Sequence, residues 1–235
     1  MREAKFTSYN KYLEDITKIN ITFDEHSYLK DIPFCYKYVN FINPTKKHAN
    51  EKYLIFTSAF QIKLLKKVKQ IYIDGTFQIC PKNYYQVINI AGYLEDINAI
   101  VPIFLIPTTG KTEYLYNHIF NDIKLILKDA NYNLEDVTKY FMLDFEVGLQ
   151  KAIKLNFPNA LISGCFFHFV KCLWEKAKKL YLCKKDKIKH TKILIFALKI
   201  IPFIDIDHRT EFFKKIEDFY SSFKNDNNYN KLKQY

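Results

Sequence analysis

Hydrophobic and polar positions alternate with a period of two along IYIDGTFQICP, from Ile71 to Pro81. One set of positions holds Ile71, Ile73, Phe77 and Ile79, and the other holds Tyr72, Asp74, Thr76 and Gln78. This period is typical of a β-strand. Asp74 stands out because aspartate is a poor strand former and a charged carboxylate away from water is costly unless it is compensated. The pattern therefore predicts a buried strand that carries one carboxylate in need of a partner.

The same reading predicts the elements on either side of this strand. Apolar residues approach helical spacing in the second half of Tyr53–Gln70, and the basic end of that segment suits a helix C-terminus. Strands are expected at Gln70–Ile79, Tyr84–Tyr93 and Ala99–Ile106, with connections typical of hairpins. The next predicted elements are a helix within TEYLYNHIFNDIKLILKDAN and a strand within TKYFMLDFE. They are followed by a helix in VGLQKAIKLNF and a strand in NALISGCFF. From Phe167 onward the pattern is helical and basic.

The predicted order is β-β-β-α-β-α-β followed by helices, which defines an α/β protein with a mixed sheet and flanking helices. This is the order of the ribonuclease H-like core, although other α/β domains share such orders. We expect an N-terminal extension over residues 1–50, the core over 51–170, and the start of a basic helical insertion over 171–235.

Composition narrows the class of protein. No apolar run reaches the roughly 20 residues of a membrane span, and the polar N-terminus does not resemble a signal peptide. Five cysteines, an odd number, suggest free thiols in a reducing compartment. We therefore expect an intracellular protein with no membrane partner.

The formal net charge of +11 suggests a polyanionic partner. Only Arg2 and Arg209 are arginine among the 36 basic residues, and the chain is rich in residues that A/T-rich codons specify. Part of the charge therefore reflects base composition, since an adapted nucleic-acid surface normally uses more arginine. The charge favours DNA or RNA binding without proving it.

A second aspartate, Asp144, ends the apolar strand within FMLDFE. In a ribonuclease H-like sheet the first and fourth strands are parallel neighbours, so Asp74 and Asp144 would converge on one edge. Two such carboxylates repel unless cations lie between them, and a pair of hard divalent ions can cleave phosphodiesters. The pattern thus favours a shared Mg²⁺ or Mn²⁺ pair. The alternative is that each acid caps a turn, since Asp-Gly is a common turn dipeptide.

Four segments then resemble, in order and spacing, the MULE (Mutator-like element) transposase domain. They are IDGTFQICPKNYYQVINIAGY, VPIFLIPTTGKTEYLYNHIF, MLDFEVGLQKAIKLNFPNALISGCFFHFVKCLW and ILIFALKIIPFIDI. The resemblance implies a DDE transposase on a ribonuclease H-like fold, with Asp74 and Asp144 as its first two metal-binding aspartates. It also implies Mg²⁺ or Mn²⁺ as cofactor, transposon ends and target DNA as partners, and a nuclear location, and it leaves a homo-oligomer open.

The family's third acid is a glutamate after an inserted helical region, within a stretch like R-T-N-N-x-x-E, and no such stretch is present here. We expect the chain to end inside that insertion and to cleave DNA poorly by itself. Glu146 is a candidate substitute ligand, but an acid at the N-terminus of the following helix is the favoured interpretation. A transposase-derived protein that binds DNA or protein without catalysis is the main alternative, and a ribonuclease H-like nuclease unrelated to transposition is another.

GKT at Gly110–Thr112 lacks the earlier glycine of a phosphate loop, so Thr112 is expected to start a helix. The resemblance makes Cys165 and His168 a C-x-x-H signature near the active site, and their spacing does not favour zinc. A lysine cluster is either a solvated helix face or a phosphate-contacting surface. It consists of Lys176, Lys178, Lys179, Lys184, Lys185, Lys187, Lys189 and Lys192.

Overall fold

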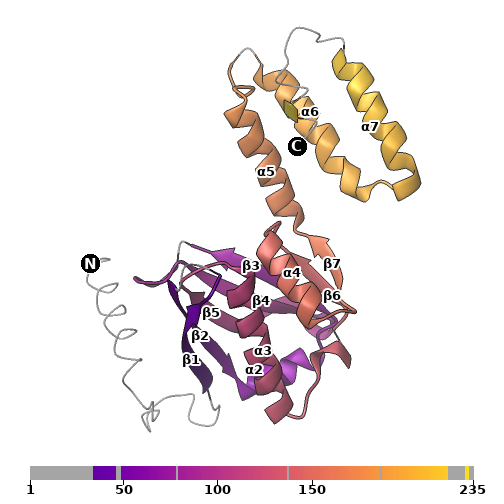
Figure 1. The fold of residues 1–235 in the computed structure, drawn as a ribbon. Helices are drawn as coiled ribbons and strands as arrows, with labels where there is room; N and C mark the ends of the chain where they lie inside the picture. The colour runs from indigo at the N-terminus through magenta and orange to yellow at the C-terminus, as the bar shows by residue number, and fades with distance from the viewer. Residues whose placement is uncertain are drawn as a thin grey trace, which may run out of the picture. The chain divides into compact units, whose positions relative to one another are not determined.

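The computed structural model describes residues 34–45, 49–77, 79–136, 138–185, 187–221 and 231–232 (Figure 1). The chain divides into two compact units, Met1–Ser163 and Gly164–Tyr235. Residues 1–33 of the expected N-terminal extension lie outside the described residues. No helix in the described part of the chain combines the length and the apolar character needed to cross a bilayer.

A mixed sheet of seven strands in the order β1-β2-β5-β4-β3-β6-β7 forms from the described residues. Strand β3 pairs antiparallel with β4 and parallel with β6, while β4 pairs antiparallel with β5. Five of these strands, in the sheet order β5-β4-β3-β6-β7, confirm the predicted ribonuclease H-like α/β fold. The first and fourth predicted strands, β3 and β6, are parallel neighbours. The strands are β1 (Phe34–Asn43), β2 (Ala49–Ser58), β3 (Gln70–Thr76), β4 (Gln86–Leu94), β5 (Ala99–Thr108), β6 (Tyr140–Leu143) and β7 (Leu161–Gly164).

Strands β1 and β2 extend the sheet beyond β5 and were not predicted. Tyr53, Leu54 and Ile55 are all fully buried in β2, so this strand lacks the alternation that marks a half-exposed strand. The helix expected in the second half of Tyr53–Gln70 is present as α2 (Ala59–Leu65). The hydroxyl of Ser58 caps it by accepting a hydrogen bond from the Gln61 backbone N–H at 3.2 Å.

Strand β3 is shorter than predicted. Ile71 and Ile73 are buried as expected, with 2% and 3% of their surface exposed. The strand ends at Thr76, however, and Phe77 and Ile79 are 56% and 65% exposed. The expectation that these two side chains are buried is therefore wrong, because the chain leaves the sheet before it reaches them. Asp74 is exposed as well, so water compensates its charge in part.

The helices of the first unit pack their apolar sides against the sheet. The predicted helix is present as α3 and buries one apolar face, with Ile119, Phe120 and Ile123 each at most 2% exposed. The hydroxyl of Thr112 accepts a hydrogen bond from the Leu115 backbone N–H at 3.1 Å, which confirms Thr112 as the helix start. The elements are α3 (Glu113–Asp129), α4 (Val147–Asn156) and the 3₁₀ turns η1 (Glu95–Ile97) and η2 (Leu134–Asp136).

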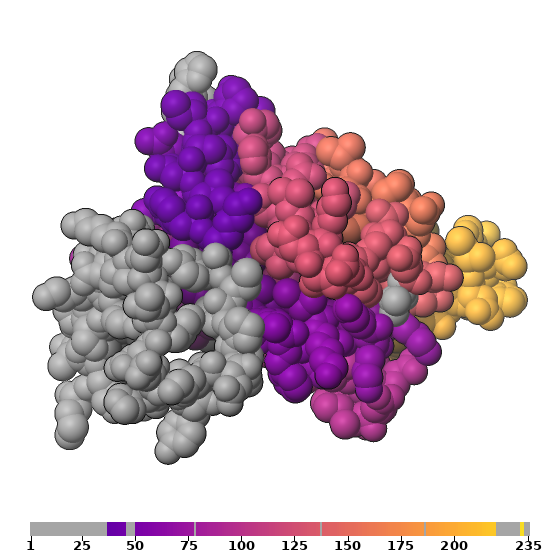
Figure 2. Space-filling model, turned by 90° about the horizontal axis from the view of Figure 1, so that it is seen from below, coloured from indigo at the N-terminus to yellow at the C-terminus, as the bar shows by residue number. Residues whose placement is uncertain are grey.

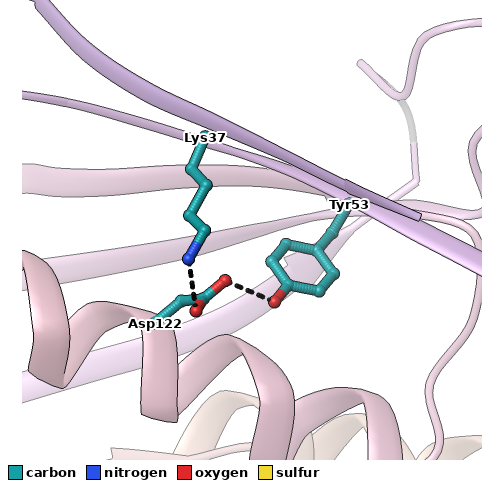
Figure 3. A network of polar contacts seen from close by, with 3 residues as sticks. All are labelled: Lys37, Tyr53 and Asp122. Atoms are coloured by element: carbon teal, nitrogen blue, oxygen red, sulfur yellow. Dashed lines mark hydrogen bonds and ion pairs between the residues drawn. The ribbon is translucent and has the colours of Figure 1, made fainter. Parts of the chain in front are cut away.

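Two further contacts attach α2 and the outer strands to α3. The Tyr132 hydroxyl, just beyond α3, donates a hydrogen bond to the Leu65 carbonyl of α2 at 3.2 Å. In Figure 2 the purple surface of α2 accordingly meets the pink surface of the residues that follow α3. On α3, Asp122 accepts a hydrogen bond from the Tyr53 hydroxyl and forms an ion pair with Lys37, both at 2.7 Å (Figure 3).

The second unit is helical and has an apolar core of its own. Its elements are α5 (Phe166–Lys179), α6 (Ile188–Ile200), the 3₁₀ turn η3 (Ile201–Phe203) and α7 (Ile206–Ser221). Its buried apolar residues are Leu173, Ala177, Leu182, Leu194, Ile195, Leu198, Ile216 and Leu232.

Candidate functional site

Asp74 and Asp144 lie beside each other at the same edge of the sheet. In the parallel pairing of β3 with β6, Ile73 is opposite Leu143. Asp74 directly follows Ile73, and Asp144 directly follows Leu143, so the register brings the two aspartates to equivalent positions. Ile73 is buried and side chains alternate along a strand, so Asp74 belongs to the opposite set of positions, while Asp144 directly follows the last residue of β6. The register thus brings the two aspartates to neighbouring positions near the carboxyl ends of β3 and β6.

The residue after Asp74 is a glycine for a steric reason. Gly75 pairs with Ile88 of β4 inside the strand ladder, so Asp-Gly is not a turn here, and the turn interpretation of Asp74 is wrong. A Cβ atom on Gly75 would lie 2.6 Å from Oε1 of Gln86. Real Cβ atoms do not approach an oxygen so closely, so glycine lets the buried Gln86 side chain pass against the backbone beside Asp74.

Gln86 begins a buried polar chain that ends beside Asp144. Its Nε2 donates a hydrogen bond to the Tyr116 hydroxyl at 2.9 Å, and that hydroxyl donates to Oε1 of Glu146 at 3.0 Å. Gln86 and Tyr116 are each only 1% exposed. Buried polar groups need such partners, and a satisfied network fixes the position of its members. This series of polar contacts therefore links the backbone next to Asp74 with Glu146, two positions after Asp144.

Glu146 occupies the N-cap position of α4, but its side chain makes no capping hydrogen bond and instead accepts from Tyr116. Burial raises the pKa of the Glu146 carboxyl, the Tyr116 hydrogen bond and the Lys111 charge lower it, and the Asp144 charge raises it. Its position at the start of the helix agrees with the favoured interpretation of this acid. The Oδ1 atom of Asp144 accepts a hydrogen bond from the Phe145 backbone N–H at 2.6 Å, which orients that carboxylate locally.

Residues 70–172 match the family model of the MULE transposase domain. Over these residues, which make up less than half of the chain, the sequence is similar to the MULE transposase domain, and this segment is called the MULE domain from here on. The match begins at the first residue of β3 and ends within α5, so it contains both aspartates, Glu146, Cys165 and His168. The comparison with curated proteins gave no match. The match suggests a transposase-related function.

The C-x-x-H pair of the MULE domain lies at the start of α5, in the second unit. Cys165 is the N-cap residue of that helix, and His168 follows in its first turn. Within the described ranges, no three or more His, Cys, Asp or Glu side chains form a group that could hold a metal ion. This finding applies both to the cysteine–histidine pair and to the acids at the edge of the sheet.

The lysine cluster also belongs to the second unit. Lys176, Lys178 and Lys179 end α5, and Lys189 and Lys192 lie on α6. Lys184, Lys185 and Lys187 lie in the connection between these helices. Six of the eight side chains are exposed, and those of Lys176 and Lys187 are half-buried. Lys184 Nζ lies 5.4 Å from the ring centroid of Tyr181, which is itself 68% exposed.

Sequence reasoning missed Gln86 and Tyr116 as site residues. Tyr116 carries the same signal as the core-facing residues of α3, and Gln86 stands at the start of a strand, where a polar residue is ordinary. Only the fold reveals that the two side chains meet beneath the edge of the MULE domain that carries the aspartates.

Proposed function

We propose that the MULE domain is the catalytic core of a DDE-type transposase. In this proposal it cleaves DNA phosphodiesters and joins DNA strands, and Asp74 and Asp144 are its catalytic carboxylates. The observation that carries the proposal is the parallel register of β3 and β6, which brings the two aspartates side by side. The family match supports a transposase-related function, and the paired carboxylates support phosphoryl transfer as its chemistry.

Asp74 and Asp144 carry the type of oxygen donor that Mg²⁺ or Mn²⁺ prefers. Hard divalent cations prefer carboxylate oxygens, and Asp74 and Asp144 supply them from two neighbouring strands. When bound, such ions polarise the phosphate and lower the pKa of a coordinated water. Asp74 and Asp144 would hold the ions, while Gln86 and Tyr116 would keep the spacing between the two chain segments.

In the same proposal, residues 171–235 form part of a helical insertion whose lysines contact the DNA backbone. Cys165 and His168, at the start of α5, help to position DNA or the catalytic segment. Action on genomic DNA would place the protein in the nucleus of a cell that has one. Assembly of several copies on two transposon ends is compatible with this function.

Metal binding tests the proposal most directly. We expect the full chain to bind Mn²⁺, measured by titration calorimetry, and Asp74→Asn and Asp144→Asn each to weaken binding about tenfold or more, because each removes a charged oxygen ligand. Asp129→Asn, which changes an exposed aspartate at the end of α3, is the matched control and should bind as the wild type does.

DNA cleavage is measured with the same proteins. Any Mg²⁺- or Mn²⁺-dependent cleavage should disappear in both aspartate variants and persist in the control. Unchanged metal affinity in Asp74→Asn and Asp144→Asn would contradict the proposal, and metal-independent DNA binding would then favour a transposase-derived protein without catalysis.

A further inference from the structure

Exposed apolar side chains gather where β3 ends, a few residues beyond Asp74. Phe77, the first residue after the strand, is 56% exposed, and Ile79 is 65% exposed. Tyr85, the residue before β4, is 45% exposed. Large apolar groups that cluster on a surface commonly mark a binding site.

Phe77 and Tyr85 form an aromatic pair with a defined geometry. Their ring centroids lie 5.4 Å apart and the ring planes are inclined at 88°, so the edge of one ring meets the face of the other. This contact holds two half-exposed rings in a fixed relation at the surface. The aromatic pair is therefore an ordered apolar surface of the kind on which flat groups stack.

Lysines border the aromatic pair and connect it to the acidic edge. Lys111 Nζ lies 5.9 Å from the ring centroid of Tyr85, and its charge also acts on the Glu146 carboxyl. On the neighbouring residue, Lys52 Nζ lies 5.2 Å from the ring centroid of Tyr84. A cation thus lies close both to the aromatic pair and to the acid that follows Asp144.

We propose that the aromatic pair and Lys111 bind unpaired DNA next to the scissile phosphate, with bases stacked on Phe77 and Tyr85 and a backbone phosphate held by Lys111. This inference rests on the proposed function, since DNA at the acidic edge is what brings bases to these rings. Aromatic faces stack with every base, so the site is sequence-tolerant.

Single-stranded DNA fits this surface better than a duplex because base faces are covered in a duplex and open in a single strand. A duplex would gain from the lysine charge and gain nothing from the rings. The site therefore favours DNA whose strands are separated near the cleavage point. The lysine cluster of the second unit supplies phosphate contacts to single-stranded and duplex DNA alike.

The test measures the affinity of the full chain for labelled single-stranded and duplex oligonucleotides by fluorescence anisotropy, in chelator so that no cleavage occurs. Phe77→Ala and Tyr85→Ala should each weaken single-strand binding about 5- to 100-fold, with little change for the duplex. Phe60→Ala is the matched control, because Phe60 of α2 is 55% exposed and should leave both affinities unchanged.

Salt dependence and side-chain shape separate stacking from other contacts. Phe77→Ala should leave the log–log salt slope as it is, whereas Lys111→Gln should lower the single-strand slope by about 0.7. Phe77→Trp should keep the affinity, and Phe77→Leu, which retains apolar volume without a ring, should weaken it as alanine does. Circular dichroism melting confirms that each variant is folded.

Wild-type single-strand affinity in Phe77→Ala and Tyr85→Ala would overturn the proposal, and so would an equal loss for single strand and duplex. Wild-type affinity in Phe77→Leu would overturn stacking and indicate a general apolar contact, such as one with a protein. Asp74→Asn should keep the single-strand preference, so a failure of cleavage and a failure of stacking appear in different measurements.

Discussion

Three side chains behind the aspartates show how single residues define this site. Gln86 passes against Gly75, Tyr116 bridges, and Glu146 receives the last hydrogen bond. Tyr116 is buried, and its hydroxyl accepts a hydrogen bond from Gln86 and donates one to Glu146. The loss of either hydrogen bond would therefore weaken the other. These contacts connect the backbone beside Asp74 to the residue two positions after Asp144.

Glu146 should make stability depend on pH. Its pKa is raised by burial above the ordinary value of 4.5, so the folded chain holds this proton more tightly than the unfolded chain. Its contribution to stability is therefore full below about pH 4.5 and is lost as the pH rises through the raised value. Glu146→Gln keeps an acceptor for Tyr116 and removes the charge, so its melting temperature should exceed that of the wild type by more at pH 7 than at pH 4.

Thermal unfolding followed by circular dichroism across this pH range checks the expectation. Glu175→Gln, at an exposed position of α5, is the control and should show no such trend. A melting difference that is constant with pH in Glu146→Gln would mean that the carboxyl is not destabilised by its surroundings.

Individual elements are joined by a few charged contacts in addition to the apolar core. Asp122 of α3 binds Lys37 of β1 and Tyr53 of β2, so one carboxylate attaches both unpredicted strands to the helix (Figure 3). Tyr53 is fully buried, and its pKa is strongly raised by burial and by the Asp122 carboxylate. The Tyr53 hydroxyl therefore stays neutral and donates to a charged acceptor.

Tyr53→Phe should destabilise the first unit by about 1.5–3 kcal/mol, the range for a hydrogen bond to a charged group. Tyr132→Phe is the matched comparison, because the Tyr132 hydroxyl donates to the neutral Leu65 carbonyl, and it should cost about 0.5–1.5 kcal/mol. Urea denaturation measures both losses. Equal losses would show that the charge of Asp122 adds nothing to this attachment.

At the scale of the whole molecule, the two units divide the proposed work between chemistry and DNA binding. The first carries the acidic edge, and the second carries exposed lysines at the junction of α5 and α6. Charge contacts with phosphates weaken steeply with salt because each releases condensed counterions.

Replacing Lys178, Lys179, Lys184 and Lys185 by glutamine should lower the log–log salt slope of duplex binding by up to about 3.6 if all four contact phosphates. The charge-matched control replaces four exposed lysines of the first unit, Lys63, Lys66, Lys139 and Lys154, and should keep the slope. Anisotropy titrations at several salt concentrations measure both. Equal slopes in the two variants would identify the lysine cluster as a solvated surface.

The order of the core elements was predictable from local patterns, because local periodicity reflects which side chains face the core. The period-two stretch Ile71–Pro81 located β3, the connections typical of hairpins bounded the segments that form β4 and β5, and α3 formed within the segment predicted to be helical. Thr112 was identifiable as a helix start because capping is a local interaction. The same order of elements, with motifs that resemble the MULE family, made Asp74 and Asp144 candidates before their positions were known.

Features that depend on contacts between distant segments were not predictable from local patterns. Strand β2 escaped detection because burial on both faces, as in Tyr53–Ile55, removes the alternation that marks a strand. Phe77 and Ile79 continue the period of β3, yet they lie outside the sheet because β3 ends at Thr76. The link from Gly75 through Gln86 and Tyr116 to Glu146 joins four separate elements, and no local pattern in the sequence encodes a contact of that range.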